Sequence, residues 1–405
     1  MASVARWTRL RAVLAAALAM VGCGGDVVSP AVAEPTPALA PAPRRVEVEP
    51  VDAGVDAASV LDAATPPDAW RRPRPRSASE EVGSLFDPRE DEAVLERLRT
   101  EDIVGVERGR GGRSVAFRVT LASGARAYFK PEQTFSGTHW YAEIAAFHLD
   151  RLLGLRRTAP STGRCVAGEV LAPALEGDAH ADEVVVGEDG MVRGALIAWM
   201  EERLVPLVPP VGWERALRAE PFEGIVPFVA PIELRRARAR AIGDAGTDAA
   251  MTDDAPAGEL LDAGGDHDGG TPWDEDARSA ELSSLVVFDF LVHNGDRWGG
   301  GYTNVRTRGP GGPLVYLDNA AGFTAGRGRI TLDSRLGFVQ RFDRRLLRRV
   351  RRLEVGALEG SLASDPLAPI LDEARLARFE ERRAALLAHV DALVAELGED
   401  RVMAW

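Results

Sequence analysis

Two compositionally biased segments set what this chain can fold into. Residues 23–80 are rich in Ala, Pro, Val and Asp, and residues 243–276 contain 11 acidic and no basic side chains. Segments of this kind bury too little apolar surface to offset the entropy of ordering the backbone. We therefore expect residues 23–80 to be a disordered tether and 243–276 a disordered acidic insertion. One folded domain is expected over 85–400.

The first 22 residues have the features of an export signal. A stretch with three arginines precedes the apolar run Ala12–Val21, which is too short to span a bilayer comfortably. The sequence Met20-Val21-Gly22-Cys23 resembles a bacterial lipobox, in which the cysteine is lipidated and becomes the mature N-terminus. This predicts an exported lipoprotein at the periplasmic face or outer membrane of a bacterium, held on the membrane through Cys23. An ordinary secretory signal is the alternative.

Charge and cysteine content exclude two classes of protein. The formal net charge is −13, whereas a general nucleic-acid binder neutralises phosphates with a basic surface. Nucleic acid is therefore not an expected partner. The chain has only two cysteines, which excludes a disulfide scaffold and a multi-cysteine zinc site.

The pattern of apolar residues over 85–400 predicts an α+β domain. Apolar positions recur at the helical period over 141–153, and alternating or continuous short apolar runs between Gly-rich turns indicate strands. Helices are expected at 93–98, 141–153, 282–292, about 341–353 and 374–397. Strands are expected at 103–106, 114–121, 126–129, 193–200, 304–307 and 314–317.

Lys130 is the only lysine among the 49 basic residues of the chain. Where arginine serves every other cationic position, a retained lysine indicates a site that needs a compact point charge, such as a place between phosphate oxygens. A helix carrying Glu143 in an apolar setting follows. Because an unpaired buried carboxylate is costly, Lys130 is the expected partner of Glu143. A strand lysine paired with a helix glutamate positions nucleotide phosphates in phosphotransferases.

Two aspartates in loops of the C-terminal half complete a phosphoryl-transfer layout. Asp296 follows a predicted core helix, and Asp318 follows a predicted strand. Phosphoryl transfer needs one carboxylate that orients the attacking hydroxyl and accepts its proton, and another that holds a metal ion. Asp296 fits the first task and Asp318 the second.

Several sequence runs closely resemble the Golgi casein kinase family and its four-jointed relatives over roughly residues 95–355. The runs that carry the resemblance are Tyr128-Phe129-Lys130-Pro131, Ala142-Glu143-Ile144-Ala145-Ala146-Phe147-His148-Leu149-Asp150-Arg151, Phe288-Asp289-Phe290-Leu291, Asn294-Gly295-Asp296-Arg297 and Leu317-Asp318-Asn319. The resemblance implies an atypical, two-lobed kinase-like fold with an antiparallel N-lobe sheet plus helix and a mainly helical C-lobe.

The resemblance also implies a reaction and a set of roles. The chain would transfer the γ-phosphate of ATP or another nucleoside triphosphate, with Mn²⁺ or Mg²⁺, to a hydroxyl of a protein or glycan. Lys130 would contact the phosphates, and Glu143 would join Lys130 and a metal. Asp296 would be catalytic and Asp318 a metal ligand. A turn containing Gly111 and Gly112 would lie over the nucleotide, and the hinge that holds adenine would include Met200.

One departure from the family pattern leaves other activities open. Five residues after the catalytic aspartate, where relatives carry a metal-binding side chain, the sequence has Gly301, and the nearest amide is Asn304. We assign Asn304 to the metal site across a three-residue insertion. The alternatives are a catalytically silent pseudokinase that binds nucleotide or protein, and an enzyme that transfers a nucleotide instead of a phosphate. The oligomeric state is not predicted.

Overall fold

The computed structural model describes residues 85–109, 113–207, 212–223, 226–228, 275–298, 304–326 and 333–405. The predicted signal and tether lie outside these residues, as does the predicted insertion 243–276 except for its last two positions. All described residues belong to one compact unit. Among them, no helix combines the length and the apolar character that a bilayer span requires.

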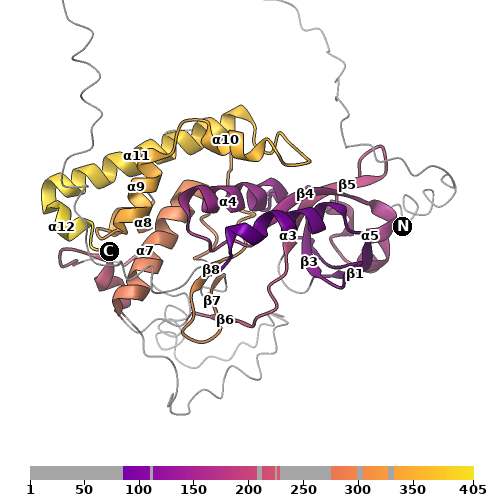
Figure 1. Cartoon of the computed structure of the whole chain (residues 1–405), viewed down its shortest axis with the longest axis horizontal. Coiled ribbons are helices and arrows are strands. Elements are labelled where there is room, and N and C mark those ends of the chain that lie inside the picture. Colours follow the sequence, from indigo (N-terminus) through magenta and orange to yellow (C-terminus); the bar gives the residue numbers. More distant parts are fainter. Residues whose placement is uncertain are drawn as a thin grey trace, which may run out of the picture. The chain divides into compact units, whose positions relative to one another are not determined.

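The N-terminal half is built on a five-stranded antiparallel sheet with the strand order β1-β2-β3-β5-β4. Figure 1 labels its strands β1, β3, β4 and β5. Alternate residues of β2 face the core, because successive side chains of a strand point to opposite faces. The expected antiparallel sheet of the N-lobe is therefore confirmed. Its strands are β1 (Ile103–Arg108), β2 (Phe117–Leu121), β3 (Arg126–Pro131), β4 (Ser161–Ala167) and β5 (Met191–Ala198).

Two helices accompany this sheet. Helix α3 (Pro88–Thr100) packs on β4 and β5. Helix α4 (Trp140–Leu153) is buried along most of its length and contacts both β4 and β5 and the C-terminal helices. It ends at Gly154, whose φ of 60° lets its N–H bond to carbonyls of the last turn. Because α4 is packed between the sheet and the C-terminal helices, the position of Glu143 in its first turn is fixed relative to both.

A small second sheet with the order β6-β7-β8 pairs a strand that follows the large sheet with two strands that follow α7. It consists of β6 (Leu204–Pro206), β7 (Val305–Arg308) and β8 (Leu314–Tyr316). Because β6 follows β5 after only five residues, the segment 199–203 links the large sheet to the small one. Strand β8 in turn leads directly to Asp318.

The C-terminal half is mainly helical, as expected. Helix α7 (Glu275–Val292) is buried from Ala277 onward, which confirms a core helix and extends it beyond the predicted 282–292. Helices α9 and α11 were expected, whereas the shorter ones were not. The C-terminal elements are α8 (Ser334–Phe338), α9 (Arg344–Arg352), α10 (Ala357–Leu362), α11 (Glu373–Leu397) and α12 (Glu399–Val402).

Three arginines of α9 bind neighbouring helices. Arg344 is ion-paired with Glu399, and Arg351 with Asp391. Arg349 donates to the carbonyls of Leu153 and Gly154 at the end of α4, at 2.9 Å each. These contacts hold α9 against α4, α11 and α12.

Several predicted boundaries were wrong for identifiable reasons. The helix expected from about residue 341 begins at Arg344, because Asp343 caps it by accepting two backbone N–H bonds. The strand expected over 193–200 ends at Ala198, so Met200 lies in the link between the sheets. Strand β6 was not assigned from the sequence. Strand β4 is joined to β5 through α5 (Gly168–Leu171) and short 3₁₀ helices.

Candidate active site

Lys130 is the point at which three distant segments meet. It lies on β3 next to Phe129, whose side chain faces the apolar core, and therefore points to the opposite face of the sheet. Its Nζ is 2.5 Å from Oε1 of Glu143 and 2.6 Å from Oδ1 of Asp318. The residue is 8% exposed. The predicted pairing of Lys130 with Glu143 is present, and Asp318 joins the same ammonium.

Glu143 lies in the first turn of α4 and is 3% exposed. Besides Lys130, its Oε1 accepts the backbone N–H of Asn319 at 3.0 Å, and its Oε2 accepts Nδ2–H of Asn319 at 3.3 Å. A buried carboxylate is stable only with such partners. Both oxygens of Glu143 are therefore held by protein donors.

Asp318 occupies a strained turn after β8. Its φ is 50°, in the left-handed region that non-glycine residues rarely adopt. The turn is held from both sides, because Asn294 Nδ2 donates to the Asp318 carbonyl at 3.0 Å and Gly322 packs against Val292 at the end of α7. A Cβ at Gly322 would come within 2.5 Å of a Val292 methyl carbon, so the close approach requires glycine. The Asp318 side chain remains 45% exposed and is accessible to a ligand.

Asp296 lies in the loop that follows α7, and its side chain is exposed. Its backbone N–H donates to Oδ1 of Asn294 at 3.2 Å. Because the other end of the Asn294 amide donates to Asp318, one side chain ties the loop of Asp296 to the turn of Asp318. The two predicted catalytic loops are therefore adjacent in the structure.

Buried hydrogen bonds of Arg297 anchor the loop that carries Asp296. The side chain is fully buried, and its Nε donates to both carboxylate oxygens of Asp289 on α7, at 2.8 and 3.0 Å. Its Nη1 donates to the carbonyl of Leu317, and its Nη2 donates to Oδ1 of Asn319 at 2.6 Å. Trp298 adds a third hydrogen bond to Asp289 at 2.9 Å. The loop that carries Asp296 is thus anchored to the helix before it and to the turn after β8.

Lys130 and Asp318 shift each other's pKa. The ammonium of Lys130 holds the pKa of Asp318 below its ordinary value. Burial alone would lower the pKa of Lys130, but Asp318 and Glu143 outweigh burial and raise that pKa above its usual range. The site thus has more carboxyl groups than cations. It can accept a polyphosphate only together with additional positive charge.

The donor set fits a hard divalent cation that is shared with a phosphate ligand. Asp318 offers an exposed carboxylate, and Asn304 Nδ2 lies 3.1 Å from Oδ2 of Asp318, so an amide is also present. Across the part of the chain that the structure describes, no three His, Cys, Asp or Glu side chains cluster to form a protein-only metal site. Mg²⁺ and similar ions in nucleotide sites typically use one or two carboxylates and complete their shell with phosphates and water.

The other predicted nucleotide contacts are the hinge residue Met200 and the turn glycines Gly111 and Gly112. Met200 lies half-buried in the link 199–203 between the two sheets, where a hinge is expected. Gly111 and Gly112 lie outside the described residues. Gly109, just before them, donates its N–H to the carbonyl of Ala116 at 2.8 Å and closes the turn between β1 and β2.

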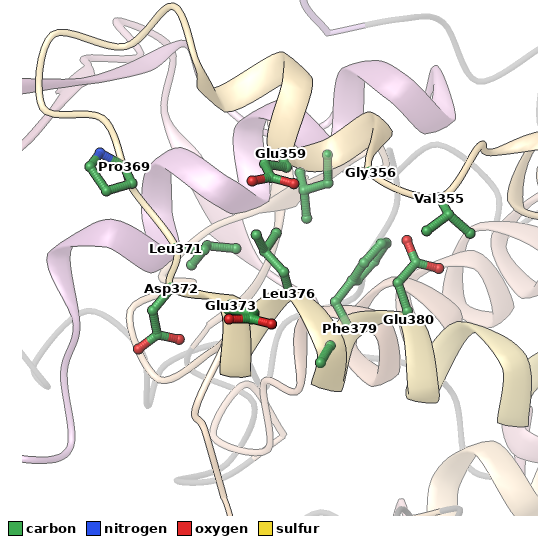
Figure 2. A pocket seen from close by; sticks show the side chains of 12 residues that line it. Val355, Gly356, Glu359, Pro369, Leu371, Asp372, Glu373, Leu376, Phe379 and Glu380 are labelled. Carbon is green, nitrogen blue, oxygen red and sulfur yellow. The ribbon is translucent and has the colours of Figure 1, made fainter.

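A groove of about 440 Å³ lies elsewhere, between α10 and α11 (Figure 2). Its floor is apolar, with Leu371, Leu376 and Phe379, and Glu359 and Glu373 are among the acidic residues that line it. None of its lining residues belongs to the site around Lys130. This groove is therefore not the nucleotide site.

Three residues of the site, Asn294, Asn319 and Arg297, received no role from the sequence, although a compositional signal could have found the two asparagines. The 405 residues contain only three asparagines, Asn294, Asn304 and Asn319. All three hydrogen-bond to Asp318 or Glu143. Asparagine is therefore rare in this chain and concentrated at the site, as lysine is. Arg297 carries no such signal among so many arginines.

Comparison with known proteins agrees with this geometry. The profile of the family described as Golgi casein kinase, C-terminal, Fam20, matches residues 69–176 and 268–402. The human glycosaminoglycan xylosylkinase is 24% identical over 336 residues, which is 77% of each chain. Human four-jointed box protein 1 is 30% identical over 268 residues, covering 62% of this chain and 51% of the relative.

Structural comparison supports the same fold. The crystal structure of the Golgi casein kinase with Mn/ADP bound has a TM-score of 0.52 and 17% identity, covering 82% of this chain and 83% of that one. The expected two-lobed kinase-like α+β fold is therefore confirmed, and the Mn and ADP are ligands of that neighbour. The family profile spans more than half of the sequence, and the chain accordingly belongs to the Fam20 family of Golgi casein kinases.

Proposed function

We propose that this chain is a phosphotransferase that moves the γ-phosphate of a nucleoside triphosphate to a hydroxyl group of a protein or glycan. The observation that carries the proposal is the position of the single lysine, between a carboxylate of α4 and a carboxylate of the turn after β8. The relatives support both acceptor classes, since one is named a xylosylkinase and another a casein kinase.

Each side chain has a role that follows from its position. Lys130 binds phosphate oxygens through its ammonium, and Glu143 keeps that ammonium in place. Asp296, exposed on the adjoining loop, orients the acceptor hydroxyl and takes its proton. Asp318, with Asn304 beside it, would hold the metal ion. A bound divalent metal supplies positive charge that the transferring phosphate needs.

The location of the enzyme is also a proposal. We infer from the basic N-terminus, the short apolar run and Cys23 that the chain is exported and anchored to a membrane by lipid on Cys23. Residues 23–80 would then hold the kinase-like domain away from the membrane surface. This location is compatible with a substrate that is itself an envelope protein or glycan.

A labelling experiment tests the activity. The purified full chain is incubated with Mn²⁺, ATP labelled in the γ-phosphate and an extract of envelope material, beside the Asp296→Asn and Asp318→Asn variants. We expect label in macromolecules with the wild type only. If neither transfer nor ATP turnover occurs but nucleotide binds, the chain is a pseudokinase. Mass spectrometry distinguishes an added phosphate from an added nucleotide, and the latter would overturn the proposed reaction.

A further inference from the structure

The side-chain amide of Asn319 lies at the junction of the two halves of the site. The residue is fully buried. Its backbone N–H and its Nδ2–H donate to the two oxygens of Glu143, at 3.0 and 3.3 Å. Nδ2 also donates to the carbonyl of Tyr316 at 3.1 Å, and Oδ1 accepts from Nη2 of Arg297 at 2.6 Å. Every hydrogen-bonding atom of the amide is therefore used.

The chemistry of the neighbours fixes which way this amide points. A guanidinium can only donate, so Oδ1 of Asn319 must face Arg297. The groups on the other side, the carboxylate of Glu143 and the carbonyl of Tyr316, can only accept and require the NH₂ group. Only an amide meets both demands in this space, because a carboxylate at this position would present an oxygen to Glu143.

The anchor behind Asn319 is buried and hydrogen-bonded to the core. Arg297 is fully buried, and its Nε is bound to both oxygens of Asp289 on the core helix α7. Hydrogen bonds therefore run from Asp289 to Arg297, from Arg297 to Asn319, and from Asn319 to Glu143. They connect the core of the C-terminal half to the carboxylate that holds Lys130.

We propose that Asn319 is a positioning residue, which fixes both oxygens of Glu143 and through them the Lys130 ammonium that binds the nucleotide. The inference rests on the proposed function of Lys130. The concentration of all three asparagines of the chain around Asp318 and Glu143 supports it, because the composition otherwise disfavours this residue. Asn319 is fully buried and acts through Glu143.

The test compares Asn319→Ala and the isosteric Asn319→Asp in the full chain. We measure KM and kcat for hydrolysis of ATP with Mn²⁺, and Kd for ADP with Mn²⁺ by calorimetry, all scaled to the folded fraction from thermal melts. Asn319→Ala should raise KM and Kd about tenfold. Asn319→Asp should be worse despite its unchanged shape, since it places a carboxylate beside Glu143. Asn319→Ser, which keeps a smaller donor, should lie nearer the wild type and substitutes for a variant that does not fold.

A matched control is Gln340→Ala. The Gln340 amide oxygen accepts the backbone N–H groups of Ala219 and Glu220, at 3.2 and 3.1 Å, within the C-terminal half. Its loss should lower thermal stability and leave KM and Kd unchanged. If both nucleotide constants stay within twofold in the Asn319 variants, or Asn319→Asp is the milder change, the positioning role is refuted while the function stands. If the wild type binds no nucleotide, the proposed function fails and this role with it.

Discussion

Replacing Lys130 by arginine separates charge from shape at the centre of the site. The ammonium lies 2.5 Å from Glu143 and 2.6 Å from Asp318 and is almost fully enclosed. A guanidinium is wider and planar, and its charge is spread over a fork. Lys130→Arg should therefore still neutralise the charge of Glu143, but its donors should no longer meet the phosphate oxygens. We expect kcat/KM to fall at least ~100-fold, about 2.7 kcal/mol of transition-state stabilisation.

Lys130→Met provides the complementary case. It leaves the 3%-exposed Glu143 with the two Asn319 donors but no cation, at a cost of about 3 kcal/mol. Asp318, with its side chain 45% exposed, can be hydrated instead and adds little. For a domain of this size the loss corresponds to roughly 5–6 °C in Tm. Lys130→Arg should lose much less.

The assays are thermal melts and manganese-dependent ATP turnover of the full chain. The predicted pattern is that both variants are inactive and that only Lys130→Met is strongly destabilised. Activity of Lys130→Arg above one tenth of wild type would refute the argument that the site needs a compact charge. A Lys130→Met variant as stable as wild type would refute the claim that Lys130 compensates buried Glu143.

Three further changes test other parts of the account. Arg297→Met should cost about 3–5 kcal/mol by chemical denaturation, because it leaves buried Asp289 without its cation, and pairing it with Asp289→Leu should recover part of the loss; a loss below 1 kcal/mol would contradict this. Burial lowers the pKa of His148 to about 4, so the unfolded chain takes up a proton between about pH 6.5 and pH 4 that the folded chain does not. The His148 contribution to stability should therefore fall as pH decreases through this window, while Asp150 and Asp289, whose pKa values burial raises to about 6, act in the opposite direction. Relative to wild type, His148→Gln should lose less stability between pH 6.5 and pH 4; identical pH profiles of the two proteins would refute this assignment. Cys23→Ser should move the protein from the membrane to the soluble fraction of fractionated cells, and continued membrane association would exclude lipid on Cys23 as the anchor.

The residues that the sequence could predict are those with a local signal. Lys130 was identified by its rarity, and Glu143 by its place in a helix of regular period. Asp296 and Asp318 were identified because each follows a core element and stands in a polar loop. The structure brings all four of these residues into one region, where Lys130, Glu143 and Asp318 are in direct contact.

What could not be predicted depends on contacts between distant segments. The bond of Arg297 to Asn319 spans 22 positions, and that of Asn319 to Glu143 spans 176. Neither has a periodic pattern that sequence inspection could use. The left-handed backbone at Asp318 likewise has no sequence signal of its own, because aspartate tolerates this region but does not require it and the surrounding turn selects it. Strand β6, only three residues long, is defined by pairing with β7.

The central claim is that Lys130, Glu143 and Asp318 form one metal-dependent nucleotide site. The most direct measurement is the melting temperature of the full chain with ADP, with Mn²⁺, and with both, compared with Asp318→Asn. At a ligand concentration of about 100 Kd, binding should stabilise the wild type by about 2.7 kcal/mol. We predict that ADP and Mn²⁺ together raise the Tm of the wild type and not that of Asp318→Asn. Equal stabilisation of the two proteins, or none in the wild type, would contradict the account.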